Sequence, residues 1–357
     1  MLEKTIKNLL VQAAGLKRFV GKEFSPRYQT PLRNKIRMWS KGFCSDSYIG
    51  YGLNKNPLEN YLTDLQMYLK AIKINADYNS VLNNKLVFTY LMKSFVRVPE
   101  PYAMIKKGQL IPLHQEDTIS NVDALIRACR KYGALIFKPI DDTADARLAA
   151  GGGVLKLEFD EPKLYLNKKL INREQLLKHI YAMDHYMVIE FIHQAKYAHD
   201  IFPLSTNTIK ILTLIDPMTE EPFIGAAFHR FGCNQSIPVD NLAQGGFVAG
   251  IEIEDGIMTR AGNPKRDHLA WYDNHPETKA PIKGVCIPRW RKLQHSMIQL
   301  AKVFAFIQYV AWDIVLQGEG FTVIEGNANT NIDAFQMHRP LLADPRVRDF
   351  YKYHKVI

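Results

Sequence analysis

The alternation of apolar and polar residues predicts helices in the first third of the chain and strands in most of the rest. Apolar residues recur every three or four positions over residues 2–20, which predicts an amphipathic helix with Lys and Arg on its other side. Further helices are predicted over residues 61–75 and 82–95. Residues 42–57 are rich in Gly, Ser and Asn and are predicted to form a loop.

From residue 134 onward, short runs of apolar and β-branched residues predict a strand-rich region. Strands are expected at residues 134–137, 154–157, 187–192, 208–215, 223–231 and 247–253. Helices are expected at residues 121–132, 172–183 and 289–305. The sequence contains no internal repeat and no low-complexity run, so a repeat architecture is excluded.

Residues 311–331 carry the most informative pattern, because two apolar strands flank a Gly-rich turn. Folding this hairpin about Glu319 places Asp313 opposite Glu325. Since side chains alternate along a strand, Asn327 shares a face with Glu325. Two carboxylates and an amide oxygen suit a hard cation, and Mg²⁺ in particular leaves positions for phosphate oxygens and water. The alternative is an ordinary hairpin with polar residues on a solvated face.

Length and composition set the class of protein. The chain has 357 residues, of which 47% are hydrophobic and 23% are charged, so we expect two or three packed lobes rather than disorder. The four cysteines are scattered without a C-x-x-C pair, which argues against a structural zinc site and fits a reducing cytoplasm. No apolar run approaches the ~18–20 residues that span a bilayer. The N-terminus lacks the features of a signal peptide.

The net charge of +10 is concentrated at the N-terminus. Residues 1–41 hold ten Lys or Arg against Glu3 and Glu23, a net charge of +8. Such a basic arm can contact anionic lipid, nucleic acid or a phosphorylated substrate. Three structural readings stay open: a helix on a membrane surface, a helix docked on the body of the protein, and a solvated face that aids solubility.

Other polar residues stand out against the apolar pattern. The cations are Lys85 at the start of a predicted helix, Lys138 at the end of a strand, and Lys210 and Arg230 within strands. The remaining candidates are Gly151, Gly152 and Gly153 before a strand, Glu190 within an apolar strand, and Asn241 in a loop. Three glycines permit close approach of the backbone to phosphate, although a flexible hairpin tip would have the same composition. Together these residues are explained if the ligand is ATP with Mg²⁺.

The number and order of these motifs resemble the ATP-grasp enzymes, and more closely their sugar-transfer-associated or α-L-glutamate-ligase-like branch. The motifs are FKP at 137–139, GGGV at 151–154, VIEFI at 188–192, STNTIKILTL at 205–214, DNLAQGG at 240–246, HPET at 275–278, IP-x-W at 287–290, AWDIVL at 311–316 and IEGNANTN at 324–331. The resemblance covers roughly residues 80–340. It implies an α+β fold of the ATP-grasp type, in which two α+β lobes clasp ATP, with a basic helical N-terminal extension.

The resemblance also implies a division of the chain. The expected parts are the basic helical extension at 1–80, a linker with the first part of the ATP-grasp region at 81–133, a lid subdomain at 134–195, a C-terminal subdomain with the metal site at 196–340, and a tail at 341–357.

Roles for single residues follow from the same resemblance. ATP is expected to bind Lys85, Lys138, Gly151, Gly152, Gly153, Glu190 and Asn241, and Asp313, Glu325 and Asn327 are expected to bind Mg²⁺, as two ions, with Mn²⁺ as an alternative. Arg230 and Lys210 are the expected catalytic cations near the γ-phosphate and the acyl-phosphate. D-alanine–D-alanine ligases carry an Arg two residues before the metal-binding Asp, where this chain has Ala311. Arg230 is therefore the preferred cation facing the reacting carbonyl.

The implied activity is an ATP- and Mg²⁺-dependent carboxylate–amine ligation through an acyl-phosphate, and the branch suggests modification of a surface polysaccharide or another glycan. The alternatives are an ATP-grasp kinase of a small molecule and a non-catalytic nucleotide-binding protein of polysaccharide assembly. The expected partners are a small-molecule or glycan carboxylate and an amine such as an amino acid. A peripheral membrane contact through the N-terminal helix, at the inner face of the membrane, and a homodimer are further expectations; nucleic acid is not expected.

Overall fold

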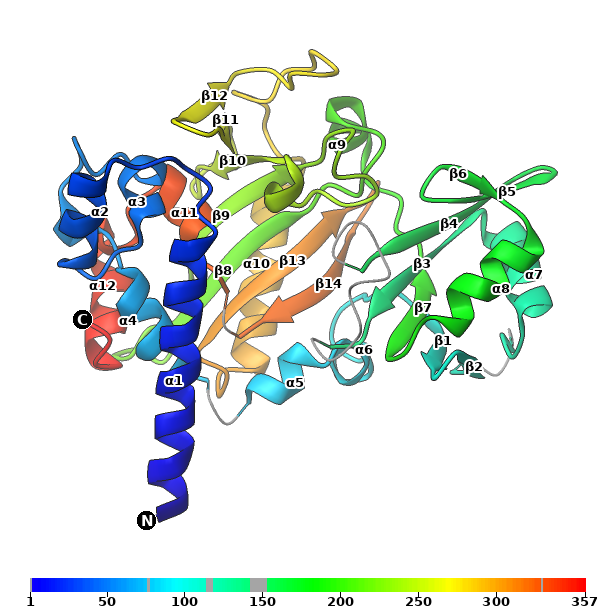
Figure 1. Ribbon diagram of the computed structural model, residues 1–357, viewed down its shortest axis with the longest axis horizontal. Helices are drawn as coiled ribbons and strands as arrows, with labels where there is room; N and C mark the ends of the chain where they lie inside the picture. Colours follow the sequence, from blue (N-terminus) through cyan, green and yellow to red (C-terminus); the bar gives the residue numbers. More distant parts are fainter. Residues whose placement is uncertain (1, 76–77, 114–117, 142–152, 329) are drawn as a thin grey trace.

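The computed structural model describes residues 2–75, 78–113, 118–141, 153–328 and 330–357, with side chains from residue 12 onward. Two antiparallel seven-stranded sheets lie next to one another, and helices pack around them (Figure 1). The smaller lobe contains β1 (Pro101–Lys106), β2 (Gln109–Pro112), β3 (Ala134–Pro139), β4 (Leu155–Asp160), β5 (Lys163–Leu166), β6 (Lys169–Ile171) and β7 (Tyr186–Glu190), in the order β2-β1-β7-β3-β4-β5-β6.

The larger lobe contains the second sheet, in the order β12-β11-β10-β9-β8-β13-β14. Its strands are β8 (Ile209–Ile215), β9 (Pro222–Phe231), β10 (Phe247–Ile251), β11 (Met258–Pro264), β12 (Leu269–Tyr272), β13 (Tyr309–Leu316) and β14 (Phe321–Asn327). These two lobes, with helices before them, confirm the predicted α+β architecture with a helical N-terminal extension.

The smaller sheet is covered by α7 (Val122–Tyr132) and α8 (Arg173–Tyr181). Each helix begins after an Asn whose side chain accepts hydrogen bonds from the first turn, Asn121 for α7 and Asn172 for α8. The buried core beneath them includes Phe137, Leu157 and Val188. This core gives β3 and β7 a fixed position, and these are the strands that carry Lys138 and Glu190.

The larger sheet has a hydrophobic core on each face. On one face lie α5 (Asn79–Asn83), α6 (Lys85–Met92) and α10 (Trp290–Val303); on the other lie α4 (Asp64–Leu69), α11 (Asp333–His338) and α12 (Pro345–Tyr353). These six helices bury the sheet, while one end of it stays accessible to the smaller lobe (Figure 1).

On the face of the larger sheet that α4, α11 and α12 cover, the side chains change from apolar to charged toward one end of the strands. Along β8, Leu214 and Leu212 are buried in the core shared with α12, and Lys210 follows on the same face. Along β13, Ala311 belongs to this core and Asp313 comes next on its side of the strand. The period of two in these strands therefore places polar residues together where the apolar core ends.

The N-terminal extension consists of α1 (Leu2–Phe24), α2 (Leu32–Trp39), α3 (Ser45–Gly50), a 3-10 turn at Leu58–Asn60, and α4. The second half of α1 docks on α4: Gly15 lies against the backbone of Tyr68, where a Cβ would find no room. The first half runs away from the body of the molecule (Figure 1). Within the described ranges no helix is both long and apolar enough to cross a membrane.

Ion pairs of Lys22 attach α1 to α4 and α11. The Lys22 ammonium lies 2.7 Å from the Asp64 carboxylate of α4 and 2.8 Å from the Asp333 carboxylate of α11. The Tyr51 hydroxyl donates a further hydrogen bond of 2.8 Å to Asp333. Because α11 follows β14 closely in the chain, this network connects the N-terminal helices to the strand that ends at Asn327.

Three predictions about the first hundred residues are wrong in detail. Residues 42–57 are not simply a loop, because they contain α3. The helix predicted over residues 61–75 ends at Leu69, and a separate 3-10 turn spans Ala71–Lys73. The helix predicted over residues 82–95 is interrupted at Asn84, whose extended backbone separates α5 from α6 and whose side chain caps α6.

Candidate functional site

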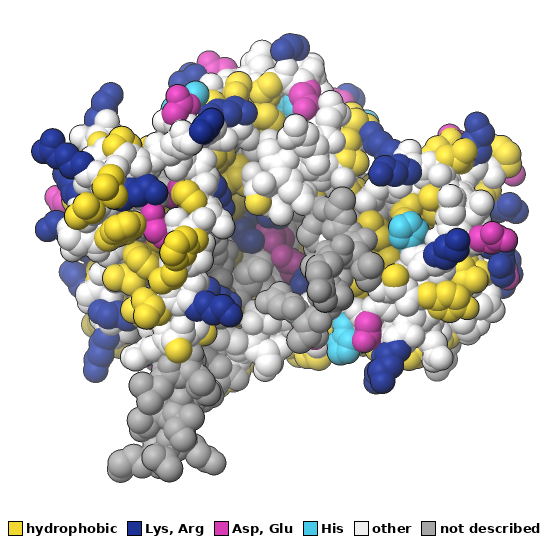
Figure 2. All heavy atoms as spheres, in the orientation of Figure 1, with side chains coloured by type: hydrophobic (Ala, Val, Ile, Leu, Met, Phe, Trp, Pro, Cys, Tyr) yellow, Lys and Arg dark blue, Asp and Glu magenta, His cyan; other side chains and the backbone are white. Residues whose placement is uncertain are grey.

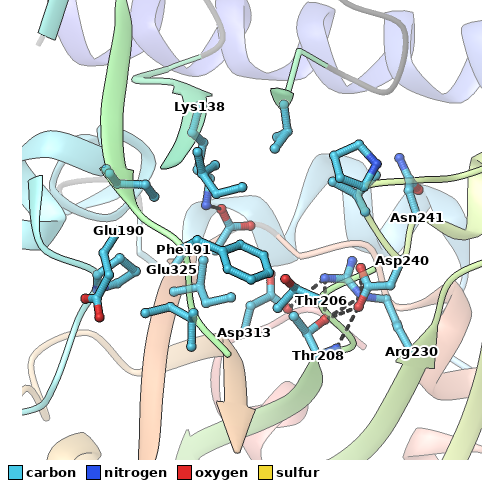
Figure 3. A pocket seen from close by; sticks show the side chains of 18 residues that line it. Lys138, Glu190, Phe191, Thr206, Thr208, Arg230, Asp240, Asn241, Asp313 and Glu325 are labelled. Carbon is cyan, nitrogen blue, oxygen red and sulfur yellow. Dashed lines mark hydrogen bonds and ion pairs between the residues drawn. The ribbon is translucent and has the colours of Figure 1, made fainter. Parts of the chain in front are cut away.

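A cavity opens between the two lobes, at the end of the larger sheet (Figure 3). Its polar lining includes Lys138 from β3, Arg230 from β9, Asp313 from β13 and Glu325 from β14. Apolar residues, among them Ile136, Val154, Phe191 and Ile324, line the rest. A site with one apolar part and one charged part suits a ligand that combines a flat organic group with phosphates.

The hairpin of β13 and β14 sets the centre of this site. Ile314 lies opposite Val323, as in a regular hairpin. A β-bulge then shifts the register by one residue, so that Asp313 lies opposite Glu325 rather than Ile324. The predicted pairing of Asp313 with Glu325 is therefore confirmed, and the bulge is what produces it.

Three cations converge on these two carboxylates from different strands. The Lys138 ammonium, from the smaller lobe, lies 2.7 Å from Glu325. The Lys210 ammonium lies 3.0 Å from Asp313, and the Arg230 guanidinium lies 3.5 Å from it. Figure 3 shows Lys138 and Glu325 pointing toward one another across the cavity. Positive and negative groups are thus arranged so that a phosphate and a metal ion could enter between them.

The two carboxylates respond differently to burial. Burial raises the pKa of Asp313, although Lys210 and Arg230 oppose that shift. Burial acts in the same direction on Glu325, but Lys138 and Lys85 outweigh it and hold the pKa of Glu325 well below its usual value. Glu325 is therefore an anion at neutral pH, while Asp313 is the member of the pair whose charge a further cation would stabilise.

The residues predicted as metal ligands fit a hard cation in kind. Asn327 shares the site, with its amide nitrogen 3.2 Å from Asp313 and 3.4 Å from Glu325. Asp313 Oδ1 is buried and accepts no hydrogen bond from the described residues, although the Lys210 ammonium lies 3.0 Å and the Arg230 guanidinium 3.5 Å from it. The described part of the chain contains no cluster of three or more His, Cys, Asp or Glu suited to a metal, and the set here is two carboxylates and an amide.

Asp240 is a site residue that the sequence analysis did not single out. It is buried, lies 3.3 Å from the Arg230 guanidinium, and accepts hydrogen bonds from the Thr208 backbone N–H at 2.7 Å and hydroxyl at 2.6 Å. The Thr208 hydroxyl oxygen in turn accepts hydrogen bonds from Arg230. Arg230 is therefore held between Asp240, Thr208 and Asp313. The only available sequence signal was the position of Asp240 beside Asn241 in the DNLAQGG motif.

Lys85 lies behind the metal-ligand candidates. It begins α6, and its backbone N–H donates to the Ile140 carbonyl, which joins α6 to the smaller lobe. Lys85 lines a small polar pocket together with Glu325, Asn327 and Arg18 of α1. Arg18 was not predicted, because nothing in the sequence indicates which helix passes beside the end of β14.

The remaining predicted residues lie at the edges of the cavity. The Glu190 carboxylate binds the Arg97 guanidinium at 2.6 Å and points away from the Lys138–Glu325 pair (Figure 3). Asn241 lines the far side, where its side chain caps a short 3-10 turn at Leu242–Gln244. Gly153 packs against Pro139 with a φ of +88°, so a side chain there would clash. Gly151 and Gly152 lie outside the described residues.

The histidines near the site have structural partners. His229 is fully buried between the Tyr197 hydroxyl, at 2.8 Å, and the backbone of Arg230. Burial lowers the pKa of His229 to about 3, so it is neutral at physiological pH. His275 is also buried and contacts the Gly232 carbonyl at 2.9 Å. Neither ring lines the cavity, and both support the strands and loops that carry site residues.

Several solved structures are similar to this chain at low sequence identity. Among solved structures, the ATP-grasp ligase PsnB complexed with a minimal precursor is 12% identical, with a TM-score of 0.35, and the match covers 74% of this chain and 57% of that one. D-alanyl-alanine synthetase A from Vibrio cholerae is 10% identical, with a TM-score of 0.41 and coverage of 76% and 66%. D-alanine–D-alanine ligase from Bacillus anthracis is 12% identical, with a TM-score of 0.37 and coverage of 81% and 78%.

The chain spans only about half the length of some of the proteins it resembles. The match covers 57% of PsnB and 46% of an N5-carboxyaminoimidazole ribonucleotide synthetase. A search of curated protein sequences found no match. A family model described as sugar-transfer associated ATP-grasp matches residues 67–349, which is more than half of the chain. The chain therefore belongs to the sugar-transfer associated ATP-grasp family.

Proposed function

We propose that the protein is an ATP- and Mg²⁺-dependent carboxylate–amine ligase that forms an amide through an acyl-phosphate. The observation that carries this proposal is the convergence of Lys138, Lys210 and Arg230 on the facing carboxylates of Asp313 and Glu325. ATP-grasp enzymes use ATP and typically Mg²⁺, and this arrangement supplies both phosphate-binding cations and oxygen ligands for a metal.

Each residue then has a role that follows from its place. Lys138 and Lys85 neutralise the phosphates from two sides. When ATP binds, the Glu190 carboxylate releases Arg97 and accepts hydrogen bonds from the ribose hydroxyls instead. Asp313, Glu325 and Asn327 would hold Mg²⁺, whose charge would neutralise phosphate oxygens. Arg230 faces the acyl-phosphate, while Lys210 keeps Asp313 in position. Asn241 and Gly153 complete the nucleotide site.

The chemistry needs positioning and charge stabilisation rather than an enzyme nucleophile. A carboxylate oxygen of the substrate attacks the γ-phosphorus of ATP, the bond to the bridging oxygen breaks, and ADP leaves. The amine then attacks the acyl carbon, phosphate departs, and the amine gives up a proton. Arg230 stabilises the negative charge that develops on the acyl oxygen, because it is held rigidly by Asp240 and Thr208.

The substrates we propose are a sugar acid, such as a uronic acid on a glycan precursor, and an amine such as an amino acid. The description of the family as sugar-transfer associated supports this choice. Mass spectrometry of a purified sugar acid after reaction would detect the amide. ATP turnover with pairs of amino acids, but never with a sugar acid, would contradict the glycan assignment.

The decisive experiment measures ADP release from Mg²⁺ and ATP in the presence of pooled sugar acids and amino acids. The test variant is Asp313→Asn combined with Glu325→Gln, and the matched control is Glu319→Gln in the exposed turn of the same hairpin. ADP release that requires both an acid and an amine, is lost in the test variant and persists in the control supports the ligase. Release without an amine would indicate a kinase, and ATP binding without turnover would indicate a non-catalytic role.

A further inference from the structure

The helix α1 carries an apolar stripe on the face that points away from the body. The stripe consists of Leu16, Val20 and Phe24, whose exposed fractions are 53%, 41% and 83%. Residues four apart lie on one face of a helix, and the buried Gly15 and the partly buried Lys22 lie on the face toward the body. In the sequence the same spacing of three and four continues back from this stripe toward residue 2. The side chains of this stripe are therefore not buried in the core of the described chain.

A second stripe of the same kind lies on α2. It consists of Leu32, Ile36 and Trp39, whose exposed fractions are 67%, 56% and 40%. Met38, on the other side of α2, is fully buried in the small core that it forms with Phe43 and Tyr61. Figure 2 shows hydrophobic side chains gathered over α1 and α2 on one face of the molecule, with Lys and Arg between and around them.

The charge around the stripes is almost entirely positive. Lys17, Arg33, Arg37 and Lys41 are exposed beside them. The only acidic residue between positions 12 and 41 is Glu23, and its carboxylate is occupied by the Ser45 backbone N–H and hydroxyl at 2.8 and 2.6 Å. The surface is therefore both apolar and cationic, without an acidic group free to balance it.

We propose that these two stripes and their flanking cations, which we call the N-terminal docking face, bind the surface of a bilayer that contains anionic phospholipids. Apolar side chains on one side of a helix enter the boundary between headgroups and acyl chains, while neighbouring Lys and Arg contact lipid phosphates. Charge complementarity favours this occupant over a second copy of the chain, since two copies would bring two cationic faces together.

The docking face is fixed relative to the candidate active site. The ion pairs of Lys22 with Asp64 and Asp333 join α1 to α11, just after β14. On its inner side α1 also supplies Arg18 to the polar pocket beside Glu325 and Asn327. A protein bound through this face would hold the cavity at a set orientation to the bilayer, as an enzyme acting on a membrane-associated glycan precursor would require. Binding itself does not rest on the proposed ligase activity.

The test is co-sedimentation of the full chain with vesicles of phosphatidylcholine alone and of phosphatidylcholine mixed with phosphatidylglycerol. We expect binding to the mixed vesicles that weakens with added salt, and much weaker binding to the neutral ones. Leu32→Ser combined with Ile36→Ser is expected to weaken binding about tenfold or more, because both side chains lose their insertion into the interface. Arg33→Gln combined with Arg37→Gln is expected to weaken it by a similar factor, and only for the anionic vesicles.

The matched control combines Leu170→Ser with Met218→Ser, which removes two exposed apolar side chains from other parts of the molecule. All variants alter exposed side chains, so thermal unfolding should be unchanged. Absence of vesicle binding in the wild type, or equal binding by the Leu32/Ile36 variant and the control, would overturn the proposal. Concentration-dependent dimerisation that the Leu32/Ile36 variant abolishes would assign the face to a second copy instead. ADP release without vesicles tests the ligase separately.

Discussion

Asp240 illustrates how one buried carboxylate can determine the position of another residue. Its oxygens are shared between Thr208 and the Arg230 guanidinium. We predict that Asp240→Asn leaves the affinity for ATP close to that of the wild type but lowers kcat about 10- to 100-fold, because Arg230 loses the charge that aims it at the reacting group. Steady-state kinetics and nucleotide titration of the purified variant measure both quantities.

The control for this prediction is Asp200→Asn, an exposed carboxylate that pairs only with Lys196 on the same helix among the interactions described. It should change neither kcat nor ATP affinity. A parallel loss of ATP affinity and of folding in Asp240→Asn would show that Asp240 supports the whole loop rather than Arg230. A wild-type kcat would remove Asp240 from any account of the site.

At the scale of elements, Lys22 attaches α1 to the rest of the protein. Its ammonium is the partner of the buried carboxylates of Asp64 and Asp333. Lys22→Met is predicted to reduce the free energy of unfolding by about 3–5 kcal/mol, because it removes the ammonium within 2.8 Å of both carboxylates and leaves Asp333 only the more distant Arg27, at 4.0 Å, as a cation among the ion pairs described. Lys17→Met changes an exposed residue of the same helix and should have little effect on stability. Urea denaturation followed by fluorescence gives the comparison, and equal stability of the two variants would contradict the role of this network.

The same network should make stability depend on pH. Burial acts to raise the pKa of Asp333, but Lys22 and Arg27 outweigh it and lower this pKa below 3.8. A lowered pKa stabilises the fold above the unfolded value, and the contribution is lost as pH falls through the folded value. The difference in unfolding free energy between wild type and Lys22→Met should therefore be constant from about pH 5 to pH 9 and shrink below about pH 4. A difference that does not change on acidification would contradict this assignment.

The elements show what the sequence could predict and where local pattern was insufficient. Short runs of apolar and β-branched residues were enough to predict β8, β9 and the β13–β14 hairpin, because β8, β9 and β13 are buried on both faces. The facing of Asp313 and Glu325 was predicted for a turn centred on Glu319, but the structure reaches it through a bulge that no residue pattern announced. Short strands such as β1, β2 and β12 were missed, although β2 and β12 each pair with the strand directly before them, because runs of four to six residues show too little of the period to indicate a strand.

The site residues that could be predicted together from the sequence are those that lie in one hairpin. The cluster of Asp313, Glu325 and Asn327 lies in one hairpin and could be assembled by counting. Asp240 and Arg18 reach the same region from a loop and from the N-terminal helix, and only tertiary contacts bring them there. The exposed stripe on α2 was likewise missed. The sequence of this eight-residue helix does not show which of its apolar side chains are exposed.

At the scale of the whole molecule, charged side chains link the two lobes at the cavity. Lys138 of the smaller lobe binds Glu325 of the larger one at 2.7 Å, and Arg97, just before β1, binds Glu190 at the end of β7 and contacts the Thr322 hydroxyl of β14. Such contacts can be exchanged for ligand phosphates and hydroxyls with little loss of buried apolar area. The lobes are thus joined by groups that a nucleotide could take over.

This exchange makes Lys138 the residue that should separate phosphate recognition from adenosine recognition. We predict that Lys138→Ala weakens binding of Mg²⁺–ATP about 10- to 100-fold, the loss of one charge-assisted hydrogen bond of about 1.5–3 kcal/mol, and leaves adenosine binding nearly unchanged. Lys169→Ala, on the exposed edge strand of the same sheet, is the matched control and should bind both ligands normally. Isothermal titration with both ligands distinguishes the outcomes. An equal loss for adenosine would mean that Lys138 maintains the cavity itself, because a cation that acts on phosphate cannot weaken a ligand that has none.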